Sequence, residues 1–270
     1  MKNFWKKLKK PILALAPMAG FTDSAFRTIC KNYGAEVAYS EIASASALFF
    51  HPHTKITGKK ATGKNLNSAY KAGDFGVGAG HTKTLELLKF TEKERPYVVQ
   101  LFGNNPEHFA FAAKLIDSLP LEKGDQEGFE KPCNINKISK SHKYCANSHL
   151  LPLLQRGKLI RPDGIDINFG CPAPKVFKTG AGCALMGNKK LAREIISAVC
   201  ENTKLPVSIK IRSGLKDTTA VEFIKYIKDL PFSAVMIHGR TYEEGFSGPV
   251  NFEIAEKIKK IIPDKNNPVH

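Results

Sequence analysis

The fold of this chain is decided by one stretch, Gly164-Ile165-Asp166-Ile167-Asn168-Phe169-Gly170-Cys171-Pro172-Ala173-Pro174-Lys175-Val176. Apolar and polar residues alternate through its first part, which predicts a short strand that enters a core. Gly170 and Pro172 then interrupt the strand, so we expect a tight turn that presents Cys171. Small residues at 178–183 predict a flexible loop beside that thiol. Packing as a small hydrophobe is an equally good interpretation of Cys171 taken alone.

Short apolar runs alternate with helical patterns on both sides of this stretch. We expect strands at residues 12–16, 37–41, 97–102, 165–167, 207–211 and 234–237. We expect helices at residues 24–33, 82–93, 106–118, 188–201, 218–230 and 251–262. Strands that alternate with longer helices predict right-handed βαβ units and a parallel sheet. The pattern therefore predicts an α/β protein, a TIM-type (β/α)8 barrel that is incomplete, with about six β/α units.

Two segments interrupt this alternation. Residues 51–80 are polar, glycine-rich and basic, and residues 121–161 lack a readable period. Both are predicted to be insertions into a single barrel domain that spans residues 1–270. The Cys and His residues of the second segment have no spacing that is typical of a metal site, so we expect no metal.

The charge and the cysteines limit the class of protein. A formal net charge of +16 predicts a polyanionic partner, either nucleic acid or an anionic membrane surface, and a solvated lysine-rich surface is the alternative. No apolar run reaches the roughly 18 residues of a membrane helix, so no membrane span is expected. Six cysteines without a C-x-x-C pair predict reduced thiols and a cytoplasmic location.

Polar or reactive residues follow the expected strands. They are Pro17-Met18-Ala19, Glu41, Gln100, Asn168 with Cys171, Lys210 with Arg212, and His238 with Arg240. Strands covered by helices are normally apolar, and the carboxyl ends of barrel strands meet at one mouth, where this fold places its chemistry. These residues provide cations and amide groups but only one carboxylate, and a hard metal ion needs several oxygen ligands, so we do not expect a metal there. They suit a phosphate and a flat heteroaromatic ring, and flavin mononucleotide (FMN) has both.

Five motifs, which occur in the order of the family, resemble the tRNA-dihydrouridine synthase family. They are Pro17-Met18-Ala19-Gly20-Phe21-Thr22-Asp23, Val99-Gln100-Leu101-Phe102-Gly103, Asn168-Phe169-Gly170-Cys171-Pro172, Lys210-Ile211-Arg212-Ser213-Gly214 and His238-Gly239-Arg240-Thr241. The resemblance covers most of the chain outside the two insertions. It implies an enzyme that uses FMN to reduce selected uridines in tRNA to 5,6-dihydrouridine, with NADPH as the reductant. It also implies that the partner is tRNA and that the protein is a monomer.

The resemblance also implies a role for each residue of the mouth. The flavin ring would be lined by Pro17, Met18 and Ala19. Its polar edge or ribityl chain would be bonded by Gln100, Lys210 and His238. The substrate would be bound by Asn168, Arg212, Arg240 and Lys175, with Asn168 beside the uracil.

Cys171 would be the general acid of this reaction. Hydride from the flavin adds to C6 of uracil, and C5 then needs a proton from the opposite face. A thiol of ordinary acidity is mostly protonated at neutral pH and can donate that proton.

Members of the resembled family continue beyond the last residue of this chain. The C-terminal strands, their phosphate-binding loops and a helical tRNA-binding domain are therefore expected to be absent, and the chain is expected to retain FMN poorly. Two alternatives stay open: another FMN-dependent barrel oxidoreductase that acts on small molecules of the dihydroorotate or enoate type, and an inactive, truncated RNA-binding remnant. The basic charge and the Cys171-Pro172 turn favour the tRNA interpretation.

Overall fold

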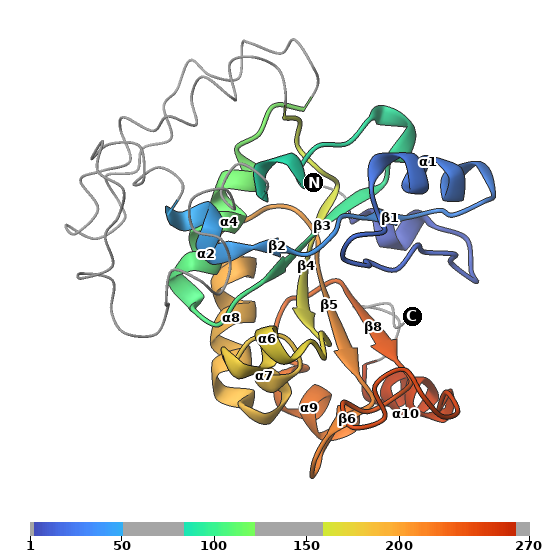
Figure 1. Cartoon of the computed structure of the whole chain (residues 1–270), viewed down its shortest axis with the longest axis vertical. Helices are drawn as coiled ribbons and strands as arrows, with labels where there is room; N and C mark the ends of the chain where they lie inside the picture. Colours follow the sequence, from blue (N-terminus) through green and yellow to red (C-terminus); the bar gives the residue numbers. More distant parts are fainter. Residues whose placement is uncertain (1–2, 51–83, 122–158, 263–270) are drawn as a thin grey trace.

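The computed structural model describes residues 3–50, 84–121 and 159–262. Within these ranges, a curled parallel sheet of six strands forms part of a barrel (Figure 1). The strands along the sheet are β1 (Ala38–Tyr39), β3 (Tyr97–Phe102), β4 (Gly164–Phe169), β5 (Val207–Arg212) and β8 (Ala234–His238), and β2 (Ala43–Ser44) also pairs with β3. The expected α/β class and the incomplete TIM-type barrel are confirmed.

Helices cover the outer face of this sheet and fill its connections. They are η1 (Phe4–Lys7), α1 (Ser24–Asn32), α2 (Ala45–Phe50), η2 (Glu92–Glu94), α4 (Pro106–Asp117), α6 (Pro174–Lys178), α7 (Ala184–Gly187), α8 (Lys189–Glu201), α9 (Ala220–Ile227) and α10 (Glu253–Ile261). A small antiparallel hairpin of β6 (Gly214–Leu215) and β7 (Thr218–Thr219) precedes α9.

Local sequence explains where the longer helices begin. The side chain of Asp23 accepts a bond from the N–H of Phe26, 2.8 Å away, and Asn188 caps α8 in the same way. Asn105 caps α4, whose first residue is Pro106. A side-chain oxygen at this position satisfies an N–H that has no partner within the helix, and proline at the first helical position loses no bond.

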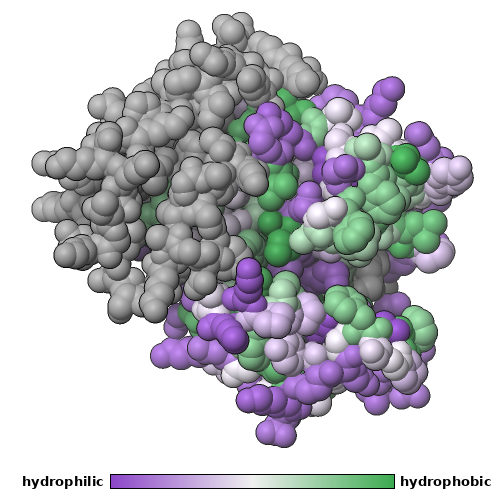
Figure 2. Space-filling view, in the orientation of Figure 1, coloured by the Kyte–Doolittle hydropathy of each residue, from purple (hydrophilic) through white to green (hydrophobic). Residues whose placement is uncertain are grey.

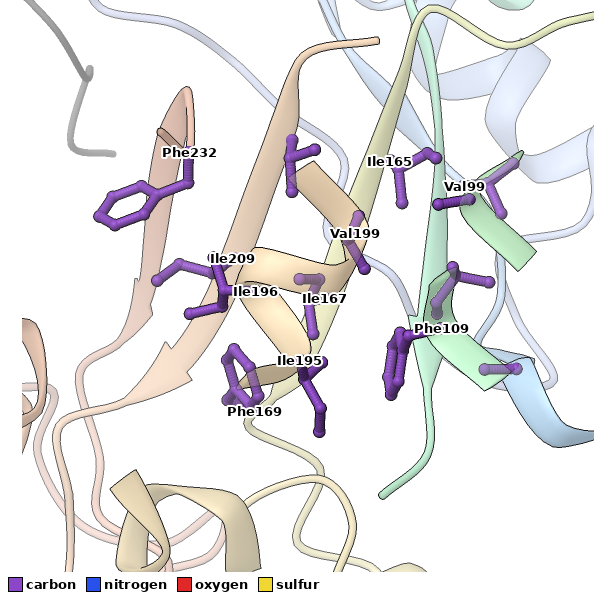
Figure 3. Packing of buried hydrophobic residues seen from close by; sticks show 14 of the residues in the cluster. Val99, Phe109, Ile165, Ile167, Phe169, Ile195, Ile196, Val199, Ile209 and Phe232 are labelled. Carbon is purple, nitrogen blue, oxygen red and sulfur yellow. The ribbon is translucent and has the colours of Figure 1, made fainter. Parts of the chain in front are cut away.

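The period of two along the central strands separates two environments. Ile165, Ile167 and Phe169 of β4 are fully buried on the outer face of the sheet. Figure 3 shows them among the apolar side chains that α8 and α4 direct toward the strands, such as Val199 and Phe109. The other residues of β4, which alternate with these, point to the inner face of the barrel.

A second, smaller core closes the amino ends of the strands on the inner face. Its buried members are Trp5, Val37, Tyr39, Val98, Ala234 and Met236. Trp5 of η1 is 2% exposed and lies 6.5 Å from Tyr39 between ring centroids. Apolar side chains therefore fill the amino end of the partial barrel. The polar groups of the inner face lie nearer to the carboxyl ends of the strands.

Some expected elements are different in the structure. Residues 12–16 contribute only one bridge, from Ala14 to Val37, instead of a strand. Residues 84–93 are interrupted: helix ends at Glu86, a turn follows, and η2 begins at Glu92. The segment after Cys171 forms α6 and α7, which are joined by turns at residues 179–183 that bury Ala181 and Cys183. A loop is therefore present there, and its flexibility stays a prediction. Tertiary contacts override local propensity in the first two cases.

The two expected insertions lie mostly outside the described residues. Around the second one, the N–H of Arg161 donates to the carbonyl of Pro120, 2.7 Å away. The chain therefore leaves and re-enters the described fold at one point, next to the buried Leu159 and Ile160. That these segments are insertions stays a prediction.

Apolar side chains are exposed at the described surface in two places. Figure 2 shows them over α1 and near the loop that follows β8. They include Phe21, Ile29 and Tyr33 at the first place, and Phe246 and Phe252 at the second.

Candidate active site

The inner face of the sheet carries polar side chains in successive rows. Gln100, Asp166 and Ser208 are aligned across β3, β4 and β5. Two residues further along the strands, Asn168 is aligned with Lys210. The register of β5 and β8 then aligns Arg212 with His238 at the carboxyl edge. The structure therefore brings together on one face the strand residues that the sequence predicted for the mouth.

A chain of hydrogen bonds crosses the two inner rows. Ser208 Oγ donates to Asp166 Oδ1 at 2.6 Å, and Gln100 Nε2 donates to Asp166 Oδ2 at 2.7 Å. Asn168 Nδ2 donates to Gln100 Oε1 at 2.8 Å. Gln100 and Asp166 have no exposed surface, and Asn168 is 6% exposed. The role of Gln100 as a direct flavin contact stays a prediction, and its observed contacts are to the protein.

Cys171 lies in a turn that is held from both sides. Asn168 Oδ1 accepts bonds from the N–H groups of Gly170 and Cys171, at 3.0 and 2.8 Å. The carbonyl of Cys171 accepts a bond from the N–H of Cys183 at 3.2 Å. Cys171 is partly exposed. The chain therefore turns after Phe169, as Gly170 and Pro172 predicted, and Cys171 is partly exposed on that turn.

Lys210 is a cation inside the half-barrel. Among the residues that the structure describes, none forms a hydrogen bond or an ion pair with its ammonium group. Burial lowers the pKa of Lys210, whereas the charge of Asp166 opposes that change. Burial in turn raises the pKa of Asp166 to about 6, against the bonds from Ser208 and Gln100 and the charge of Lys210. A half-buried cation to which no described residue bonds favours an anion or a carbonyl ligand.

His238 is held as a neutral donor at the edge of the site. Its Nδ1 accepts the N–H of Arg240 at 3.3 Å, which leaves the proton of the neutral ring on Nε2. Burial and the charges of Arg212 and Lys210 lower the pKa of His238. The partly exposed ring therefore offers an N–H to a carbonyl or phosphate oxygen.

The three other cations predicted to bind the substrate have different surroundings. Arg212 is 2% exposed, and its Nε and Nη1 donate to the carbonyls of Gly170, Thr241 and Gly245 at 2.7–2.9 Å. Arg240 is partly exposed and its Nε donates to the carbonyl of Gly248. Lys175 is exposed on α6. Arg212 thus holds the loops beside Cys171 and His238 together, and substrate contacts of all three stay predictions.

The segment predicted to line the flavin ring is held by residues outside it. Thr22 is fully buried, and its hydroxyl bonds to both the N–H and the carbonyl of Met18, at 3.2 and 3.0 Å. The carboxylate of Glu41 accepts the N–H of Gly20. Met18 and Ala19 are exposed, and Pro17 is partly exposed. The segment is thus pinned beside β1 with its surface free.

The residues of this edge fit a flavin in chemistry. The ammonium of Lys210, to which no residue of the described ranges bonds, and the Nε2 donor of His238 suit the carbonyl and phosphate oxygens of FMN. The exposed surface of Met18 and Ala19 suits a flat ring.

Asp166 and Ser208 are the two residues at this site to which the sequence analysis assigned no role. The alternation of β4 places Asp166 on the inner face, and a carboxylate on a buried strand was the signal that could have identified it.

No metal site or membrane span is found within the described ranges. No group of three or more His, Cys, Asp or Glu side chains there could hold a metal ion. No described helix is long and apolar enough to cross a bilayer. The four described cysteines, Cys30, Cys171, Cys183 and Cys200, are free thiols.

Comparison with known proteins identifies the family. The model of the family described as "Dihydrouridine synthase (Dus)" matches residues 14–67 and 149–269. The chain is 29% identical over 256 residues to a "Probable tRNA-dihydrouridine synthase" of Aquifex aeolicus, an alignment that covers 94% of this chain and 59% of that protein. It is 28% identical over 250 residues to "tRNA-dihydrouridine synthase B" of Shewanella oneidensis, with 92% and 56% covered. The chain therefore spans little more than half the length of these relatives. Since the matched residues include the site from Pro17 to Asp23 and from Asn168 to Thr241, the chain belongs to the dihydrouridine synthase family.

Proposed function

We propose that this chain binds FMN at the carboxyl edge of its sheet and reduces uridines in tRNA to 5,6-dihydrouridine. One observation carries this proposal: the partly exposed Cys171 stands on a hydrogen-bonded turn at the edge where no described residue bonds to the ammonium of Lys210. The names of the relatives, tRNA-dihydrouridine synthases, support uridine in tRNA as the substrate.

The chemistry assigns a separate task to each group. FMN bound at this edge would supply, with NADPH as the source of electrons, the hydride that adds to C6 of uracil. The Cys171 thiol donates its proton to C5, so that the C5=C6 double bond becomes a single bond. The thiolate that remains takes a proton from water before the next turnover. Proton donation by a positioned side chain accelerates such a step by about 10²–10⁴-fold.

The other residues bind and orient the reactants. Lys210 and His238 hold carbonyl or phosphate oxygens of the cofactor, and the Met18 segment packs against its ring. The net charge of +16 favours a nucleic acid over a small neutral enone as substrate. The target uridine leaves its stack to reach the edge.

The decisive experiment measures flavin and product in the same samples. The chain is purified, its flavin absorbance is recorded, and it is incubated with NADPH and tRNA that lacks dihydrouridine. Dihydrouridine is quantified by mass spectrometry after nuclease digestion. We expect Cys171→Ala to keep the flavin absorbance and to lose product by about 10²-fold or more. Cys30→Ala, a partly exposed thiol on α1, is the control and is expected to keep both.

Three results would overturn parts of this proposal. Unchanged product in Cys171→Ala would remove the acid role. Reduction of dihydroorotate or a small enone without reduction of tRNA would favour a small-molecule oxidoreductase. Binding of tRNA in a gel shift, without flavin absorbance, would favour an RNA-binding remnant.

A further inference from the structure

The most deeply buried acid of the site has no part in the reaction proposed above. Asp166 has no exposed surface and lies on the inner face of β4. It is aligned with Gln100 on one side and with Ser208 on the other. Lys210 and Tyr39 are the titratable groups that interact with it electrostatically. Burial of a carboxylate is unfavourable unless the group is hydrogen-bonded, so we ask what the bonds of Asp166 do.

The bonds of Asp166 impose a direction on the neighbouring amides. An ionised carboxylate only accepts hydrogen bonds, so Gln100 must turn its NH₂ toward Asp166 and its oxygen away. That oxygen then accepts from the NH₂ of Asn168. Asn168 is thereby left with its oxygen toward the N–H groups of Gly170 and Cys171. The amides of Gln100 and Asn168 therefore each have one orientation, because the carboxylate of Asp166 at the start of this series of hydrogen bonds cannot donate.

Reversal of either amide would break two bonds at once. If Asn168 turned over, its NH₂ would face the N–H of Cys171, and its oxygen would face the oxygen of Gln100. Donor would then face donor, and acceptor would face acceptor. Buried polar groups that lose their partners cost more than the bond itself contributes.

We propose that Asp166 is a positioning residue: through Gln100 and Asn168, its carboxylate holds the backbone turn that presents Cys171. The inference rests on the proposed function for the task of Cys171, but its geometric content is independent of that task. The competing interpretation is that Asp166 only stabilises the sheet through its two bonds.

A suitable readout is the reactivity of the thiol itself. Alkylation of Cys171 by iodoacetamide at one fixed pH is followed by peptide mass spectrometry, with Cys30 as the internal reference. Asp166→Asn replaces a charged acceptor by a neutral amide of the same size, so the charge-assisted bond that holds Gln100 is lost and the one remaining oxygen can face either Gln100 or Ser208. We expect the ratio of the Cys171 rate to the Cys30 rate to change by about tenfold, which corresponds to about 1.4 kcal/mol, the order of one charge-assisted bond.

Two matched variants separate positioning from stability. Ser208→Ala removes the other bond of the same carboxylate and leaves the amide chain intact, so the rate ratio should stay within about twofold of wild type. The double variant Asp166→Asn with Gln100→Glu restores an acceptor without donors next to Asn168. It should return the ratio toward wild type, which a loss of stability alone would not do.

The outcomes distinguish this inference from the proposed function. A rate ratio in Asp166→Asn equal to that in Ser208→Ala, or no recovery in the double variant, would overturn it. If circular dichroism shows that Asp166→Asn does not fold, Gln100→Met is tested instead. This variant removes the hydrogen bonds between Asp166, residue 100 and Asn168, while Asp166 keeps its bond from Ser208. It must then change the rate ratio. Alkylation needs neither flavin nor tRNA, so an inactive wild-type chain would refute the proposed function and leave this test unaffected.

Discussion

Gly182 lies against Cys171 so closely that a side chain at this position would have to displace its neighbours. A Cβ atom at Gly182 would be 3.0 Å from the carbonyl oxygen of Cys171 and 3.1 Å from its Cβ. The φ angle of Gly182 is +60°, in the left-handed region that favours glycine. The turn that presents the thiol is thus buttressed by α7 and its preceding loop as well as by Asn168.

Gly182→Ala is predicted to displace this turn. Alanine there adds left-handed strain of about 1–2 kcal/mol and a contact with Cys171 that backbone atoms must relieve. We expect a lower free energy of unfolding and a changed rate of Cys171 alkylation. Gly180→Ala is the control, since its φ is +76° but only Asn104 Nδ2, at 4.0 Å, is near. It should be destabilised by strain and keep the wild-type alkylation rate, and equal rates in both variants would contradict this prediction.

Arg27→Met is predicted to cost about 3–5 kcal/mol of stability, because it leaves a buried carboxylate without its cation. Arg27 pairs with Glu94, which is fully buried, and also donates to the carbonyl of Thr22 at 2.6 Å. Urea unfolding followed by the fluorescence of Trp5, the single tryptophan, measures the loss.

The control for this prediction is Arg193→Met. Arg193 pairs with Asp229 at the surface, where ion pairs contribute little, so its midpoint of unfolding should hardly move. Similar midpoints of unfolding for both variants would show that the pair of Arg27 and Glu94 contributes no more to stability than a surface ion pair does.

Asp166 is predicted to make stability depend on pH. Burial raises its pKa from 3.8 to about 6, so between these values the folded state binds more protons than the unfolded state. The free energy of unfolding should therefore fall as the pH rises through this window, by up to about 3 kcal/mol. Asp166→Asn removes this contribution, so the stability of wild type relative to Asp166→Asn should decrease from pH 4 to pH 7. A difference independent of pH would mean that the carboxyl group titrates normally.

Lys210→Met is predicted to weaken FMN binding by about 10–100-fold, the effect of losing one charge-assisted hydrogen bond. The apo chain should lose little stability, because no described residue bonds to this ammonium and its partial burial is itself unfavourable for a cation. Flavin affinity is measured by titration with fluorescence detection. Lys175→Met, on the exposed face of α6, is the control, and equal affinities in the two variants would remove Lys210 from the cofactor site.

Much of the fold could be predicted from local patterns. The alternation in β4 separated Ile165 and Ile167 from Asp166 and Asn168, and the helices expected at residues 24–33, 106–118 and 188–201 were found as α1, α4 and α8. These signals depend on neighbours within a few residues. The strand expected at residues 12–16 was wrong because distant contacts decide it, and Ala14 forms only one bridge, to Val37. The loop expected at 178–183 is present, but only the tertiary structure shows that it buries Ala181 and Cys183.

The sequence by itself determined the α/β class, the order of the strands and the gathering of polar residues at their carboxyl ends. Only the tertiary structure decided which of these groups are already bonded. Gln100 and Asp166, which share a hydrogen bond, are 66 residues apart in the sequence. Arg212 donates to carbonyl groups of loops that lie 29 to 42 residues away in the sequence. Hydrogen bonds form between groups that are close in space, and no period or spacing along the chain records that closeness. The ammonium of Lys210, which has no bond within the described part of the chain, and the bonded guanidinium of Arg212 therefore became distinguishable only after the chain had folded.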